Sequence, residues 1–126
     1  GKSSERNKKA TVSELYEKMS QDQKDRYESL MAFIYGLGDD IQDKTLKNYV
    51  AFYRIKNFAC IVFHPNDDEI LLYLKVNPDT VSLEEGFSRD VRVIGHYGTG
   101  DLEIRVSSDE DMLKVEPLIL KSYDGS

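Results

Sequence analysis

Three short apolar segments in the middle of the chain constrain its fold most. They are residues 49–55, 58–63 and 70–76. Each segment is rich in the aromatic and β-branched residues typical of strands. Only Lys56 and Asn57 separate the first two segments, and a turn of the type Pro-Asn-Asp-Asp follows the second. Because such short connections join antiparallel neighbours, the spacing predicts a three-stranded meander.

These segments are apolar on both faces of the predicted strands. Val50 and Phe52 would point to one face of the sheet, and Ala51 and Tyr53 to the other. A sheet face that is open to water would alternate more strictly between apolar and polar residues. We therefore expect the middle of the sheet to be covered on both sides, by helices, by a loop or by a partner chain.

Capping patterns predict helices on either side of this meander. Thr11 and Glu14 have the spacing of a capping box, and a second helix is predicted from about residue 20 to the glycines Gly36 and Gly38. Ser108 and Asp111 form another capping box before a C-terminal helix. Pro117 lies inside that helix, so we expect either a kink or two short segments there.

Two further strand-like segments lie between the meander and the last helix. Residues 102–106 alternate clearly, whereas residues 89–94 are compatible with a strand or a helical turn. The sequence therefore predicts an α+β fold: a mostly antiparallel sheet of about five strands, two N-terminal helices and one C-terminal helix.

Length and composition predict one folded domain with a short leader. The chain has 126 residues, of which 40% are hydrophobic and 32% charged. Residues 1–10 are basic and lack a core pattern, so we interpret them as a disordered lead-in or linker before a single domain at residues 11–126. Gly1 in place of an initiator Met suggests a cleaved tag, and the domain is expected to end a larger protein.

Several function classes are disfavoured by composition. The net charge of -6 opposes general nucleic-acid binding, and Cys60 is the only cysteine, which opposes a disulfide or a CxxC motif. No apolar stretch has the length of a membrane span, and no signal peptide is present, so the cytoplasm is the expected location. We predict no cofactor.

Residues 94–103, Ile-Gly-His-Tyr-Gly-Thr-Gly-Asp-Leu-Glu, are the most unusual segment of the chain. A phosphate loop would need a helix after the glycines, but a strand follows here. We therefore favour a turn that joins two strands, with positive φ at Gly98, Gly100 or both.

Catalytic interpretations of this segment are weaker than structural ones. His96 beside Asp101 or Glu103 could act as a general base, but no nucleophile accompanies it. Asp79 followed by Glu103-Ile104-Arg105 loosely echoes the PD…(D/E)xK pattern of restriction-type nucleases, with arginine in place of lysine. The two histidines do not have the spacing of a metal-ligand pair. We therefore predict neither catalytic nor metal-binding residues.

A basic, aromatic surface is a further candidate. Arginine and lysine side chains on neighbouring strands could hold single-stranded nucleic acid beside tyrosine rings. The structural alternative is a set of cross-strand ion pairs, such as Arg92 with Glu103.

Four segments carry a resemblance to a known family. They are Tyr49-Val50-Ala51-Phe52, Lys56-Asn57-Phe58-Ala59-Cys60, Arg89-Asp90-Val91 and the glycine segment, which is the most specific. Over about residues 49–123 the chain resembles a bacterial domain-of-unknown-function family. Members of that family occur as small proteins and at the C-terminus of proteins labelled "predicted transport protein", and some are similar to partners of restriction-type nucleases. The resemblance implies no catalytic residue.

These observations lead to one hypothesis with two alternatives. We expect a non-catalytic binding module at the C-terminus of a larger bacterial protein, which contacts a protein partner, a fused upstream domain or a second copy of itself. The alternatives are a nucleic-acid-binding accessory domain and a metal-dependent hydrolase. The predicted contact surface consists of Lys56, Asn57, Arg89, Arg92, His96, Tyr97 and Asp101.

Overall fold

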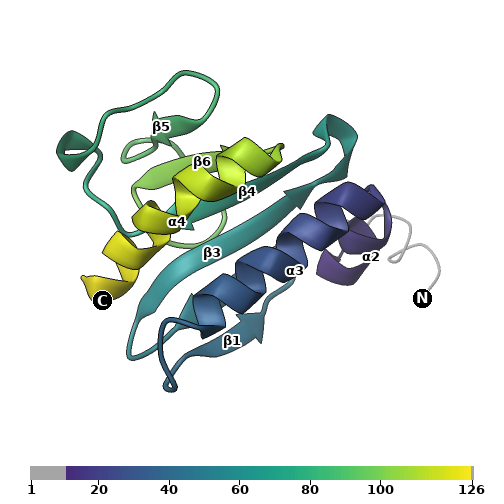
Figure 1. Cartoon of the computed structure of the whole chain (residues 1–126), viewed down its shortest axis with the longest axis horizontal. Coiled ribbons are helices and arrows are strands. Elements are labelled where there is room, and N and C mark those ends of the chain that lie inside the picture. Colours follow the sequence, from purple (N-terminus) through teal and green to yellow (C-terminus); the bar gives the residue numbers. More distant parts are fainter. Residues whose placement is uncertain (1–10, 126) are drawn as a thin grey trace.

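A computed structural model describes residues 11–125 of the chain (Figure 1). The helices are α2 (Val12–Glu17), α3 (Gln21–Tyr35) and α4 (Asp109–Asp124). The strands are β1 (Gln42–Thr45), β2 (Val50–Tyr53), β3 (Asn57–His64), β4 (Glu69–Leu74), β5 (Ser88–Asp90) and β6 (Leu102–Val106). Two 3-10 turns, η1 (Pro65–Asp67) and η2 (Pro78–Thr80), follow β3 and β4. The predicted lead-in at residues 1–10 lies outside the described residues.

The strands form one six-stranded antiparallel sheet in the order β1-β2-β3-β4-β6-β5. This confirms the α+β prediction, including the meander of β2, β3 and β4. The additional strand is β1, whose four residues are all exposed at the sheet edge. Its sequence Gln-Asp-Lys-Thr has no apolar pattern, because an edge strand with both faces in water needs none.

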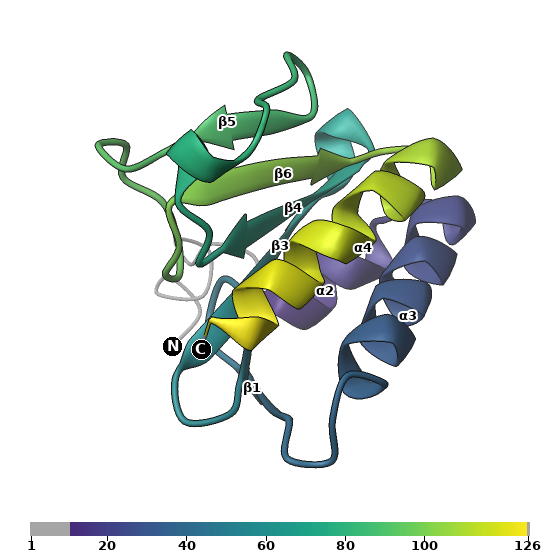
Figure 2. The same ribbon diagram turned by 60° about the vertical axis from the view of Figure 1, so that its left-hand side comes forward.

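All three helices lie on the same face of the sheet (Figures 1 and 2). Apolar residues of α2, α3 and α4 join the alternate strand residues that point toward them in one buried core. On β4, for example, Ile70, Leu72 and Leu74 face this core, and Leu71 and Tyr73 face the opposite side. We call the two sides the helix face and the loop face.

The predicted caps place the helices correctly. The Thr11 hydroxyl accepts from the Glu14 backbone N–H while the Glu14 carboxylate accepts from the Thr11 backbone N–H, which completes the capping box. The hydroxyls of Ser20 and Ser108 cap α3 and α4 by accepting from the backbone N–H of Gln23 and of Asp111. The predicted capping box of Ser108 is only half formed, because the Asp111 carboxylate accepts from the Ser107 backbone N–H. The alternative of two short C-terminal segments is wrong, because α4 continues through Pro117. Val115 and Ile119 are fully buried on either side of the proline and hold both halves against the sheet.

The loop face has its own smaller apolar cluster. Its buried residues are Ala51, Cys60, Val62, Leu71, Tyr73 and Val91. Residues 91–101, which connect β5 to β6, pass over this cluster. Of the three covers expected from the sequence, helices therefore occupy one side of the sheet and a loop occupies the other.

Candidate functional site

Two glycines let the β5–β6 loop lie directly on the sheet. Gly98 has φ +79°, and a Cβ atom there would lie 2.7 Å from Sγ of Cys60. Gly100 has φ +137°, and a Cβ atom there would lie 2.8 Å from the backbone nitrogen and oxygen of Leu74. Both positions favour glycine for backbone conformation and for close approach. The sequence predicted positive φ at one or both of these glycines, and both have it.

Aromatic stacking fastens the same loop through the two residues before Gly98. The His96 ring stacks on Tyr73 with centroids 4.2 Å apart and planes 5° apart, and Tyr97 stacks on Tyr49 at 6.3 Å and 22°. At the end of the loop the Asp101 backbone N–H donates to the Leu74 carbonyl at 3.1 Å. The loop is thus attached to β4, to β3 and to the segment before β2.

A buried polar network lies under the loop. Glu103 on β6 is only 3% exposed, yet its carboxylate is fully engaged. It accepts from the Tyr73 hydroxyl at 2.8 Å and from Nε and Nη2 of Arg89, both at 3.1 Å. Burial, followed by the bond to Glu103, raises the pKa of Tyr73 above its ordinary value. The same carboxylate raises the pKa of Arg89.

The predicted ion pair between Arg92 and Glu103 is wrong. β5 ends at Asp90, and its register places Arg89 opposite Glu103. Arg92 lies in the turn beyond the strand, where it binds Asp90 at 2.7 Å and Asp79 at 3.1 Å. The two acids of the nuclease-like pattern therefore pair with different arginines, Asp79 with Arg92 and Glu103 with Arg89.

Apolar side chains project from this fastened loop into solvent. Val93 is 96% exposed, and Ile94 and Tyr97 are each 41% exposed. We define the loop surface as Arg92, Val93, Ile94, His96 and Tyr97. Val93 and Ile94 were not among the predicted contact residues, because residues 89–94 were assigned to a strand or a helical turn. The sequence contained one signal for them, because Val93 and Ile94 immediately precede Gly95 at the start of the glycine segment.

Four of the predicted contact residues lie outside the loop surface: Lys56, Asn57, Arg89 and Asp101. Arg92 and Asp101 line a hollow of about 340 Å³ together with Lys75. Lys56 lies in the turn between β2 and β3, and Asn57 is the first residue of β3, which is separated from β5 by β4 and β6. Within residues 11–125, no hydrogen bond or ion pair joins His96 to Asp101. The structure therefore brings together only part of the predicted surface.

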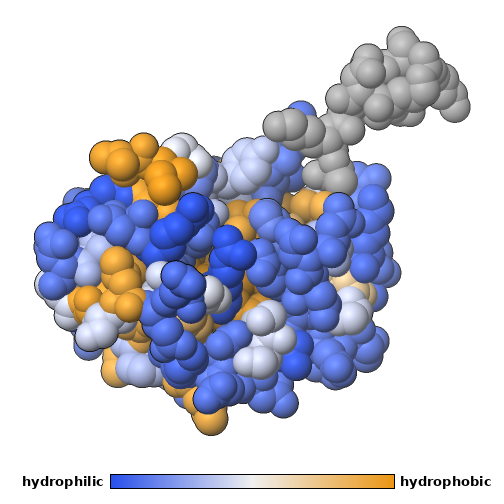
Figure 3. All heavy atoms as spheres, turned by 90° about the horizontal axis from the view of Figure 1, so that it is seen from above, coloured by the Kyte–Doolittle hydropathy of each residue, from blue (hydrophilic) through white to orange (hydrophobic). Residues whose placement is uncertain are grey.

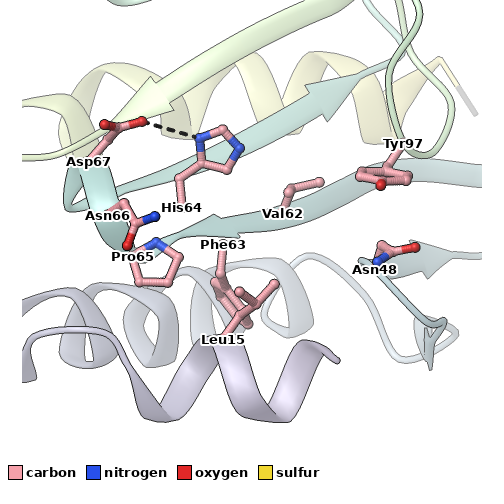
Figure 4. A pocket seen from close by; sticks show the side chains of 9 residues that line it. All are labelled: Leu15, Asn48, Val62, Phe63, His64, Pro65, Asn66, Asp67 and Tyr97. Carbon is pink, nitrogen blue, oxygen red and sulfur yellow. Dashed lines mark ion pairs between the residues drawn. The ribbon is translucent and has the colours of Figure 1, made fainter. Parts of the chain in front are cut away.

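A second cavity opens near the turn between β3 and β4 (Figure 4). It has a volume of about 320 Å³ and contains apolar walls from Leu15, Val62 and Pro65 and polar groups from Asn48 and His64. His64, Asp67 and Glu69 offer ligand atoms that all lie within 4.8 Å of one another. The spacing of the two histidines in the sequence gives no sign of this group, because it combines one imidazole with two carboxylates.

The chain belongs to a family of domains of unknown function, DUF5655, whose model matches residues 12–126. This confirms the resemblance to a domain-of-unknown-function family, whereas the bacterial origin and the C-terminal position stay predictions. The chain matches no curated protein and no solved structure. Among the described helices, none is both long and apolar enough to span a membrane.

Proposed function

We propose that this DUF5655 domain is a non-catalytic binding module that recognises a protein partner through the loop surface. The observation that carries the proposal is a loop fastened to the sheet while it holds Val93, Ile94 and Tyr97 toward solvent. In the space-filling view of Figure 3, separate hydrophobic patches interrupt a mainly hydrophilic surface. Exposed apolar groups on a rigid scaffold are typical of contact sites.

Preorganisation makes this loop a favourable contact. Burying a side chain such as Val93 or Ile94 in a partner would contribute about 1.5–3 kcal/mol. A flexible loop would lose part of that gain, because ordering one side chain costs about 0.5–1.5 kcal/mol on binding. The stacks of His96 on Tyr73 and Tyr97 on Tyr49 already order the loop in the free protein.

The polar groups near the loop favour binding over catalysis. The His96 ring lies flat on Tyr73 and contacts the Tyr97 carbonyl through Nδ1 at 3.0 Å. The Glu103 carboxylate is shared by Tyr73 and Arg89. Groups that are bound to one another in this way are poorly placed to transfer a proton to a substrate.

The ion pairs favour a protein partner over nucleic acid. Arg89 is paired with Glu103, Arg92 with Asp79 and Asp90, and Arg105 with Glu69. A phosphate would have to displace these carboxylates before it gained the arginine contact. Nucleic-acid binding is therefore the alternative, and a larger bacterial parent protein in the cytoplasm is the setting that we expect.

Site-specific photo-crosslinking tests the proposal. A photoreactive phenylalanine derivative is placed at Val93 in the full-length parent protein in its own host, and a matched control carries it at Leu113 of α4, which is 71% exposed. We expect one reproducible protein adduct from position 93 that is absent from position 113. An adduct between two copies would identify the partner as the same chain. The same adducts from both positions would contradict a specific surface.

A binding assay with the captured partner then separates the two functions. Val93→Asp should weaken the complex at least about tenfold without lowering the melting temperature, because buried hot spots dominate interfaces. Nucleic-acid binding would instead weaken by about 0.7–0.9 log units per phosphate contact for each log unit of salt. Steep salt dependence with single-stranded DNA, and no effect of Val93→Asp, would favour the alternative.

A further inference from the structure

The register of β3 and β4 brings a histidine and a buried glutamate together. His64 is the last residue of β3 and pairs directly with Glu69, the first residue of β4. Directly paired residues in an antiparallel sheet point to the same face. Nδ1 of His64 lies 3.6 Å from Oε1 of Glu69. It lies 3.7 Å from Oδ2 of Asp67, a pair that Figure 4 shows.

These separations fit ligands of one metal ion. A tetrahedral ion with bonds of about 2.1 Å places its ligand atoms about 3.4 Å apart. The separations around His64 exceed that value by only a few tenths of an ångström, and both exceed the length of a good hydrogen bond. The ligand atoms of all three groups lie within 4.8 Å of one another, so side-chain rotations would have to bring them to coordination distance.

The backbone of this turn is held by contacts outside the group. Asp68 adopts the left-handed conformation with φ +52°, and its carbonyl accepts from Nε2 of the buried Gln23 at 2.6 Å. The Asp68 carboxylate accepts from the Ser20 hydroxyl, which caps α3, at 2.9 Å. Pro65 fixes the first residue of η1. The ligands are thus carried by a turn that two residues of the helical layer anchor.

The charge balance favours a cation at this point. The Glu69 side chain is only 11% exposed, and its charge partners within the described chain are His64 and Nη1 of Arg105, which lies 3.5 Å from Oε1. Within the described residues, Arg105 is the only arginine or lysine that pairs with either of the two carboxylates. Arg105 is partly exposed and can swing toward solvent, so it competes with a metal ion without blocking it.

The cavity beside the group leaves room for further ligands. His64 and Asp67 form part of the wall of the 320 Å³ cavity, and Figure 4 shows the imidazole between Asp67 and the apolar wall at Val62. A metal bound by three side chains would therefore have a coordination position accessible to water or to a small ligand.

We propose that His64, Asp67 and Glu69 bind a divalent transition-metal ion, for which Zn²⁺ is the best match. Imidazole and carboxylate oxygens both bind Zn²⁺, whereas Mg²⁺ prefers oxygen ligands alone and keeps several waters. None of the three proposed ligands belongs to the loop surface, although Tyr97 of that surface lines the same cavity.

Calorimetric titration of Zn²⁺ into the 126-residue chain tests the site. We expect one equivalent to bind, at least about tenfold more tightly than Mg²⁺. His64→Ala should weaken Zn²⁺ binding at least about tenfold, because removal of even a supporting group at a metal site has effects of that size. The matched control is His96→Ala, which removes the only other imidazole of the chain and should leave the affinity unchanged.

Two further variants protect the test against loss of folding. Asp67 is largely exposed, so Asp67→Asn should fold normally and still weaken Zn²⁺ binding. Arg105→Gln removes the competing cation and should strengthen binding, a result that a purely structural ion pair would not produce. Absence of Zn²⁺ binding by the unmodified chain, or equal weakening by His64→Ala and His96→Ala, would overturn the proposal.

Discussion

The two faces of the sheet are built from alternate residues of the same strands, yet they differ in how they are covered. Within residues 11–125, the core on the helix face contains 22 buried apolar residues, beside the fully buried polar side chains of Gln23 and Ser122. The cluster on the loop face contains six, and it borders the buried Glu103 and the stacked His96. One face is closed by continuous amphipathic helices and the other by a single loop.

This difference separates stability from recognition. Helices bury a broad apolar area and contribute most of the hydrophobic stabilisation. A loop buries less area, but it can hold side chains in solvent in fixed positions. Substitutions on the helix face should therefore change the free energy of unfolding most, and substitutions on the loop face should change binding at a smaller cost in stability.

Substitutions of two neighbouring leucines on β4 test this comparison with the largest expected effect on stability. Leu72 is fully buried on the helix face, and Leu71 is buried on the loop face. Leu72→Ala should lower the free energy of unfolding by about 2–5 kcal/mol, because it leaves a cavity that the packed helices cannot fill. Leu71→Ala should cost at least about 1 kcal/mol less, since the buried cluster around it contains only six residues. Urea denaturation measures both, and an equal or larger loss for Leu71→Ala would contradict the comparison.

Glycine substitutions test how the loop is attached, with a smaller expected effect. Gly100→Ala should cost about 1–3 kcal/mol, because φ is positive and the new Cβ would meet the Leu74 backbone. Gly95 has open space around it and a φ outside the positive range, so Gly95→Ala is the matched control and should be nearly neutral. Thermal unfolding of the two variants distinguishes them, and similar melting temperatures would show that the loop is not closely packed on β4.

Removal of the Tyr73 hydroxyl should change the free energy of unfolding least, and this change should depend on pH. Tyr73→Phe removes the bond to Glu103 and should cost about 0.5–1.5 kcal/mol at neutral pH. The pKa of Tyr73 is raised in the folded protein above its ordinary value of 10.0, so the hydroxyl contribution is complete below pH 10 and declines as the pH rises further. The unfolding free energies of the variant and the unmodified protein should therefore converge above pH 10.

A helix-face tyrosine provides the internal reference for that experiment. Burial raises the pKa of Tyr27 to about 12, and this group is present in both proteins. Its titration lowers both stabilities equally between pH 10 and 12, so it cancels from their difference. A difference that stays constant through this range would show that Tyr73 is not shielded by the loop.

Most of the fold could be predicted because local signals and tertiary packing agree. The meander followed from its apolar segments and short turns, and the helix starts followed from Thr11, Ser20 and Ser108. β1 could not be predicted, because an exposed edge strand is specified by backbone pairing with β2 and not by its own side chains. α4 continues through Pro117 because the burial of Val115 and Ile119 offsets the lost backbone bond.

The candidate site was only partly predictable. The glycine segment identified the loop, and its residues Gly98 and Gly100 have the positive φ that the spacing suggested. The partner of Glu103 was assigned to Arg92, because the sequence did not show that β5 ends at Asp90. Val93 and Ile94 became contact candidates only when the structure showed that neither side chain is buried.

The sequence alone determined the three helices and the strands β2, β3, β4 and β6, that the sheet is covered on both sides, and that glycine is needed in the β5–β6 loop. These properties depend on local backbone preferences and on the alternation of side chains. The tertiary structure decided which cover lies on which face, that Arg89 and Tyr73 share Glu103, and that His64 meets Asp67 and Glu69. These contacts depend on strand register and turn conformation, because a shift of one residue reverses the face to which every side chain of a strand points.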